Sequence, residues 1–149
     1  MDRRSLFGRL LAAASGTASV VLAARTAQTA PQPALKVVYH IADFEKVSFA
    51  LGNIRNHIDG AGGPDAISIA VVVHGAALRA FHLAGANMEV SARVGEYTTS
   101  GVAFHACIHT MKGQNVSLAQ LMPGFEVADR GGVTRITELQ SKGYLYIRP

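Results

Sequence analysis

The single cysteine of the chain, Cys107, lies in the stretch VAFHACIHTMKG between His105 and His109. A thiolate is a nucleophile, and a helix start or a neighbouring histidine favours its formation. We therefore predict Cys107 as the residue that does chemistry and His109 as a ligand-binding neighbour. Cysteine is also among the most frequently buried residue types, so packing in the core is the alternative interpretation.

Two further histidines, His40 and His74, each come near the end of a strand-like segment. They are predicted to bind a ligand together with His109. With Cys107 they would also form a nitrogen and sulfur set suited to copper or zinc. The sequence contains no recognised metal-ligand spacing such as CxxC or HExxH, so we predict no resident metal or other cofactor, with copper or zinc at His40, His74 and Cys107 as the alternative.

Other catalytic signatures are missing from the sequence. It contains no GxSxG nucleophile elbow and no P-loop, and DGAGG does not follow a strand directly, as a dinucleotide-binding loop would. The carboxylates are scattered, without an acid and base pair. The sequence thus leaves open whether the protein is an enzyme and indicates at most a sulfurtransferase-like carrier.

The segments that must position these residues alternate between strand and helix patterns. Apolar or β-branched runs predict strands at 35–42, 66–75, 102–108 and 144–147, with a weaker strand at 125–128. Helical spacing or composition predicts helices at 44–58, 78–83, 88–100 and 133–139, and two short helices around Gly113. Such alternation predicts a single-domain α/β three-layer sandwich with a mostly parallel sheet of about five strands.

Two local features of these helices can be checked directly. Asp43 is expected to cap the first helix through its side chain. In the last helix, Val133, Ile136 and Leu139 are expected to share one apolar face.

The candidate residues fall at the carboxyl ends of the predicted strands. In open α/β sheets, ligands bind outside those ends, where the strand order reverses. His40, His74 and Cys107 are therefore expected along one edge of the sheet. His105 alternates with Cys107 on the same strand and is expected to lie deeper, in a structural role.

Residues 1–30 are predicted to be a signal peptide, followed by a domain at 31–149. The leader has a basic start and an apolar stretch from Leu10 to Ala24 that is too short for a membrane span. Arg3-Arg4-Ser5-Leu6-Phe7 matches a twin-arginine signal. We therefore expect a periplasmic or otherwise exported protein without a stable membrane span after cleavage; an uncleaved membrane anchor is the alternative.

The charge of the predicted mature domain is nearly balanced. Residues 31–149 carry ten lysines and arginines and nine aspartates and glutamates. This balance excludes the basic surface that nucleic-acid binding needs, so no nucleic-acid partner is expected. A single cysteine also cannot form an internal disulfide.

Three stretches, LGNIRNHIDGAGGPDAISIAVVVHGAAL, GVAFHACIHTMKG and ITELQSKGYLYIRP, resemble the DsrE/DsrF-like proteins of intracellular sulfur oxidation and sulfur relay. The likeness spans Leu35 to Pro149. It implies a five-stranded parallel fold, homo-oligomers such as trimers or hexamers, and a cysteine persulfide, which falls on Cys107, with His74 as the strand-end histidine. Two departures from the family are the leader, since many relatives are cytoplasmic, and Ile108, where glycine is common.

Three functions follow from these observations. The first is a sulfur carrier in sulfur-compound metabolism that holds a persulfide on Cys107 and exchanges sulfur with a donor or acceptor protein. The second is a non-catalytic periplasmic oligomer that binds a metal or small ligand. The third is a structural oligomer with Cys107 in its core. The resemblance favours the first.

Overall fold

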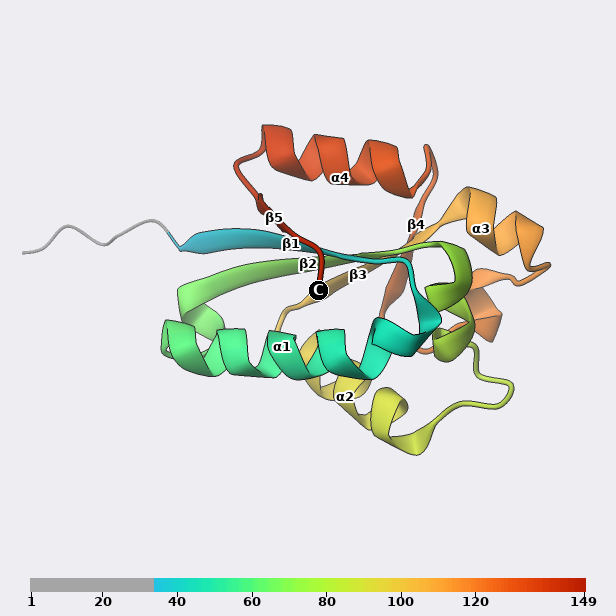
Figure 1. The fold of residues 1–149 in the computed structure, drawn as a ribbon, viewed down its shortest axis with the longest axis horizontal. Helices are drawn as coiled ribbons and strands as arrows, with labels where there is room; N and C mark the ends of the chain where they lie inside the picture. Colours follow the sequence, from blue (N-terminus) through green and yellow to red (C-terminus); the bar gives the residue numbers. More distant parts are fainter. Residues whose placement is uncertain (1–33) are drawn as a thin grey trace, which may run out of the picture. The chain divides into compact units, whose positions relative to one another are not determined.

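The computed structural model describes residues 34–149, which form a five-stranded, entirely parallel sheet with helices on both faces (Figure 1). The strands are β1 (Leu35–Ile41), β2 (Ile67–Val73), β3 (Ala103–Cys107), β4 (Phe125–Ala128) and β5 (Leu145–Ile147). The α-helices are α1 (Val47–Ala61), α2 (Met88–Thr99), α3 (Ile108–Gly113) and α4 (Gly132–Ser141). Short 3₁₀ helices are η1 (Phe44–Lys46), η2 (Pro64–Ala66), η3 (Gly75–Phe81) and η4 (Leu118–Gln120). The predicted fold class is confirmed.

The strand order β4-β3-β2-β1-β5 explains which helix covers which face. From β1 to β4 the chain steps steadily in one direction, and the right-handed crossovers place α1 and α2 on one face. The connection from β4 to β5 runs back across the sheet, so α4 lies on the opposite face (Figure 1). The strand order reverses beside β1, which pairs with both β2 and β5.

The face covered by α1 and α2 carries most of the core. Inward residues of the strands alternate with outward ones, as the pleat requires. Phe104 of β3 belongs to a cluster of three aromatic rings, with its ring centroid 6.4 Å from that of Phe81 and 5.3 Å from that of Phe125. All three rings are buried.

The opposite face has a much smaller core, formed by Val38, Ala70 and Val72 of the sheet with Ile136 and Leu139 of α4. One helix cannot cover five strands. This face therefore leaves room for polar side chains, and His105, the buried polar residue of the described chain, lies on it.

Two expectations for the helix termini were wrong. Asp43 makes no side-chain cap hydrogen bond; its carboxylate instead lies 3.2 Å from Arg148, which only the tertiary fold brings near. Val133 is 68% exposed, because α4 turns only Ile136, Leu139 and its first glycine toward the sheet. In addition, the predicted helix at 78–83 is the 3₁₀ helix η3, which ends at Phe81.

Gly124, just before β4, is expected to tolerate no side chain. Its φ is +99°, and a Cβ there would lie 2.5 Å from Oγ1 of Thr98 on α2. Gly124→Ala should therefore lower the free energy of unfolding by about 3 kcal/mol, through backbone strain and overpacking. Gly60→Ala on α1, where a Cβ meets nothing within 4 Å, should instead stabilise by about 0.5 kcal/mol. Urea denaturation measures both, and equal effects would contradict the packing argument.

The predicted signal peptide, residues 1–30, lies outside the described residues. Among the helices of residues 34–149, none has the length and apolar character needed to cross a bilayer.

Candidate functional site

The carboxyl ends of β1, β2 and β3 bring the predicted residues to one edge of the sheet, on the α4 face. His40 lies on β1, His74 directly follows β2, and Cys107 ends β3. Val73 pairs with Ala106, so His74 and Cys107 follow as neighbours on adjacent strands. A Cβ added to Gly132, the first residue of α4, would lie 3.3 Å from Cβ of Cys107 and 3.5 Å from Cβ of His74.

The Cys107 thiol is surrounded by hydrogen-bond donors. It is only 6% exposed, and burial alone would raise its pKa. The backbone N–H groups of Thr110, Gly132 and His109, together with the Thr110 hydroxyl, more than offset this, so the pKa of Cys107 is lowered from its usual value. Of the two features expected to favour the thiolate, a helix start and a neighbouring histidine, the first supplies the donors: the amides belong to the starts of α3 and α4, and no imidazole contributes.

Thr110 and Gln114 tie α3 to the loop that follows β2. The Gly75 N–H donates to Oγ1 of Thr110 at 3.0 Å, which leaves the Thr110 O–H free to donate to the sulfur. The side-chain amide of Gln114 donates to the Gly75 carbonyl at 2.8 Å. Gly75 has a φ of +60°, and a Cβ there would be 3.2 Å from the Ala42 carbonyl oxygen, so this turn favours glycine.

His40 and His74 form a contacting pair at the same edge. Their rings are stacked, with centroids 4.6 Å apart and planes 15° from parallel, and their Nε2 atoms are hydrogen-bonded to each other. Nδ1 of His40 lies 2.6 Å from the hydroxyl of Tyr146 on β5. The hydrogen-bonded series of Tyr146, His40 and His74 thus crosses β5, β1 and β2, where the strand order reverses.

Both histidines of this pair are held neutral. Burial, the charge that His74 would carry and the Arg148 guanidinium lower the pKa of His40 to about 4. Burial and Arg148 also lower the pKa of His74, while Asp43 opposes the shift in both. Only one proton fits between the two facing Nε2 atoms, so one ring donates and the other accepts. This agrees with two neutral rings, which can both donate and accept hydrogen bonds at neutral pH.

His109, on α3, is exposed and packs against the start of α4. A Cβ at Gly131 would lie only 2.9 Å from Cδ2 of the His109 ring, and Gly131 has a φ of +98°. The imidazole therefore lies beside Gly131, which precedes α4, and next to the Gly132 amide that donates to Cys107.

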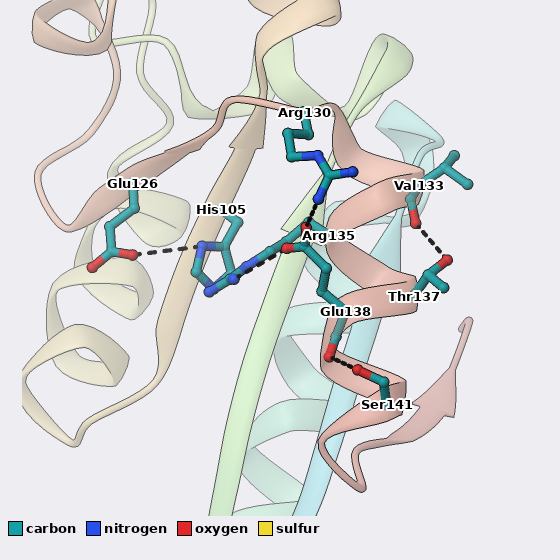
Figure 2. A network of polar contacts seen from close by, with 8 residues as sticks. All are labelled: His105, Glu126, Arg130, Val133, Arg135, Thr137, Glu138 and Ser141. Atoms are coloured by element: carbon teal, nitrogen blue, oxygen red, sulfur yellow. Dashed lines mark hydrogen bonds and ion pairs between the residues drawn. The ribbon is translucent and has the colours of Figure 1, made fainter.

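His105 is 2% exposed, in agreement with its predicted structural position. Its Nδ1 lies 3.7 Å from Glu126 and its Nε2 lies 3.4 Å from Nη2 of Arg135 (Figure 2). A guanidinium only donates, so Nε2 must be the unprotonated nitrogen. Burial, followed by the charge of Arg135, lowers the pKa of His105 to about 4, against an opposing effect of Glu126.

The burial of neutral His105 predicts that the folded protein loses stability in acid. Between pH 6.5 and 4 the unfolded chain binds a proton at His105 that the folded chain does not. The free energy of unfolding should therefore fall as the pH falls through this window, by about 3 kcal/mol from this group. Urea denaturation at pH 7 and pH 4.5 measures the loss. His105→Gln should reduce this pH dependence, and an unchanged dependence would contradict the assignment.

Several site residues were not predicted from the sequence. Tyr146 joins the site through strand pairing, Gly132 through the return of α4 across the sheet, and Thr110 through the first turn of α3, directly after Cys107. Side chains alternate between the two faces of the sheet along YLYI, residues 144–147. This alternation could have indicated that Tyr146 lies on the same face of the sheet as His40. Within residues 34–149 the structure places no three His, Cys, Asp or Glu side chains so that they could hold a metal ion, so the copper or zinc alternative gains no support.

The fold and site together define a class: a parallel α/β protein with a buried cysteine of lowered pKa at the carboxyl edge of its sheet. No protein-family profile matches the sequence, and no curated protein matches it. Similar solved structures include MTH1491 from Methanobacterium thermoautotrophicum, a protein of unknown function, with 30% identity, a TM-score of 0.67, and coverage of 77% of this chain and 99% of that one. The chain belongs to the same family as MTH1491.

Two more distant structures share the fold. The ychN protein from E. coli has 14% identity and a TM-score of 0.59, and the match covers 77% of this chain and all of that one, 100%. BT1422 from Bacteroides thetaiotaomicron, a conserved protein of unknown function, has 15% identity and a TM-score of 0.53, with coverage of 76% and 95%. All three neighbours have a DsrE-like fold, as this chain has.

Proposed function

We propose that the protein is a sulfur carrier that holds a sulfane sulfur on Cys107 as a persulfide. The observation that carries this proposal is the lowered pKa of a nearly buried thiol. A cysteine that only filled the core would have its pKa raised by burial. Here the amides of Thr110 and Gly132 and the Thr110 hydroxyl favour the thiolate instead.

The transfer is a substitution at sulfur. The Cys107 thiolate attacks the sulfane sulfur of a polysulfide or thiosulfate, and a new S–S bond forms while the S–S bond of the donor breaks. The leaving group, a shorter polysulfide or sulfite, takes the electron pair, so no additional oxidant is needed. The persulfide is itself an anion, and the same donors that stabilise the thiolate would stabilise it.

The histidines are assigned a binding role in this proposal. His40 and His74 are neutral and partly buried, and His74 lies next to Cys107, so the pair can hydrogen-bond a donor molecule without adding charge. His109, on α3, lies beside Gly131, just before the start of α4. The resemblance to the DsrE/DsrF-like proteins supports the same assignment to Cys107 and His74.

The location and assembly of the protein are part of the proposal. The leader sequence supports export to the periplasm, and the resemblance supports a trimer or hexamer that exchanges sulfur with a donor or acceptor protein. Intact mass of protein recovered from the periplasm would locate the cleavage site, and native mass would give the number of chains. Uncleaved protein in the cytoplasm would contradict export.

The experiment that tests the carrier function is intact mass spectrometry of the wild-type protein. The protein is exposed to polysulfide or thiosulfate, freed of donor, and measured before and after reduction. We expect added mass in whole sulfur atoms that maps to Cys107 and disappears on reduction. An unchanged mass, with a thiol that resists alkylation in the native state, would refute the proposal and leave Cys107 as a packing residue.

A further inference from the structure

A separate hollow lies between β4 and α4, on the same face as the thiol. It has a volume of about 240 Å³, and its lining includes His105, Glu126, Arg130, Arg135 and Glu138. Pockets for drug-sized ligands begin at roughly 300 Å³, so this hollow suits a smaller molecule. Its wall is polar and contains two guanidinium groups.

The Arg135 guanidinium makes only long contacts within this wall. It has five N–H donors. Nη2 faces His105 at 3.4 Å and Nη1 faces Glu138 at 3.6 Å, which are long contacts (Figure 2). Within residues 34–149, the buried Nε has no hydrogen-bond partner. Such a buried donor is costly unless an acceptor meets it.

A second arginine of the wall, Arg130, is available to bind a ligand. Arg130 is 78% exposed and reaches Oε1 of Glu138 at 3.1 Å. Glu138 is thus shared between Arg130 and Arg135, with one carboxylate for two guanidinium groups. Of the other two acids in the lining, Glu126 is 73% exposed and faces His105, and Asp129 makes no ion pair among the described residues.

We propose that this hollow, which we call the α4 pocket, binds a small divalent oxyanion such as sulfate, thiosulfate or phosphate. The oxygens of such an ion supply acceptors to the two Nη groups of Arg135, whose present contacts of 3.4 and 3.6 Å are long, and planar guanidinium groups match oxyanions in a bidentate geometry. This inference does not depend on Cys107 carrying sulfur.

The pocket lies next to the thiol site without sharing its side chains. Gly131 lines the pocket and contacts the His109 ring, while Gly132 contacts Cys107. His105 lines the pocket from β3, two residues before Cys107. An oxyanion held here would therefore be close to the nucleophile.

Titration of the wild-type protein with sodium sulfate, followed by thermal unfolding at constant ionic strength, tests the pocket. Sulfate does not donate sulfane sulfur, so the result is independent of the proposed carrier function. We expect a saturable rise of the unfolding temperature relative to sodium chloride. Arg135→Gln should weaken binding at least tenfold, and Glu138→Gln, which frees both guanidinium groups, should strengthen it. Arg55→Gln removes an equal charge from α1 and should bind as wild type does.

A second readout covers the case in which Arg135→Gln does not fold. The imidazole nitrogen signals of His105, assigned with His105→Gln, should shift on sulfate addition in the wild-type protein. Phosphate and thiosulfate should compete with sulfate, whereas acetate should not. No saturable rise, no shift at His105, equal binding of acetate, or unchanged binding in both Arg135→Gln and Glu138→Gln would each overturn the proposal.

Discussion

Cys107→Ser is expected to abolish sulfur loading completely. The chain has no second cysteine that could replace the thiol. Serine keeps nearly the same volume and can accept the same N–H donors, so the fold should persist. Mass spectrometry after polysulfide treatment measures the loss, and circular dichroism checks the fold. Loading equal to that of wild type would place the sulfur elsewhere.

Thr110→Val provides the matched control for this prediction. It keeps Cys107 but removes the hydroxyl that donates to the sulfur. A hydrogen bond to a charged group contributes about 1.5 kcal/mol, so the thiol pKa should rise by roughly one unit. The rate of alkylation as a function of pH reports this shift. An unchanged profile would mean that the backbone amides alone set the pKa.

Phe104→Ala is expected to cause the largest loss of stability among single substitutions in the core. The ring is 0% exposed and packs against both Phe81 and Phe125. Its removal leaves a cavity in a tightly packed cluster and should cost about 4 kcal/mol, measured by urea denaturation. Because Phe104 anchors β3 three residues before Cys107, thiol reactivity should change as well.

The control for this substitution is Phe49→Ala on α1. Phe49 is 57% exposed, so the same chemical change should alter the free energy of unfolding by no more than about 0.5 kcal/mol. If both phenylalanines gave the same loss, burial would not be what makes Phe104 important.

The fold was predicted from the sequence because its signals are local. Continuous apolar runs indicated strands buried on both faces. The spacing of Phe44, Val47, Leu51, Ile54 and Ile58 indicated one apolar face of a helix, and the structure buries all of these except Phe44, which lies in η1 and is 49% exposed. The errors arose where tertiary contacts decide. Arg148 lies far along the chain from Asp43, and nothing local to Asp43 indicates that the two would pair.

The site was predicted in part for the same reason. Parallel strands end at a common edge, so their final residues could be placed together before any contact was known. That argument located His40, His74 and Cys107. It could not supply Tyr146 or the amide of Gly132, because these depend on the pairing of β5 with β1 and on the direction in which α4 crosses the sheet.

Because α4 buries few residues, its local opening is expected to control when a reagent can reach the Cys107 thiol. Only Ile136, Leu139 and Gly132 of this helix are buried, and Gly132 lies against Cys107. Segments with few buried contacts open locally at a lower free energy than the rest of a domain. Backbone amides of α4 should therefore exchange with deuterium before those of α1, and alkylation of Cys107 should occur at the opening rate of α4. The fluctuation of one helix would then determine how long a bound sulfur atom stays protected from solvent.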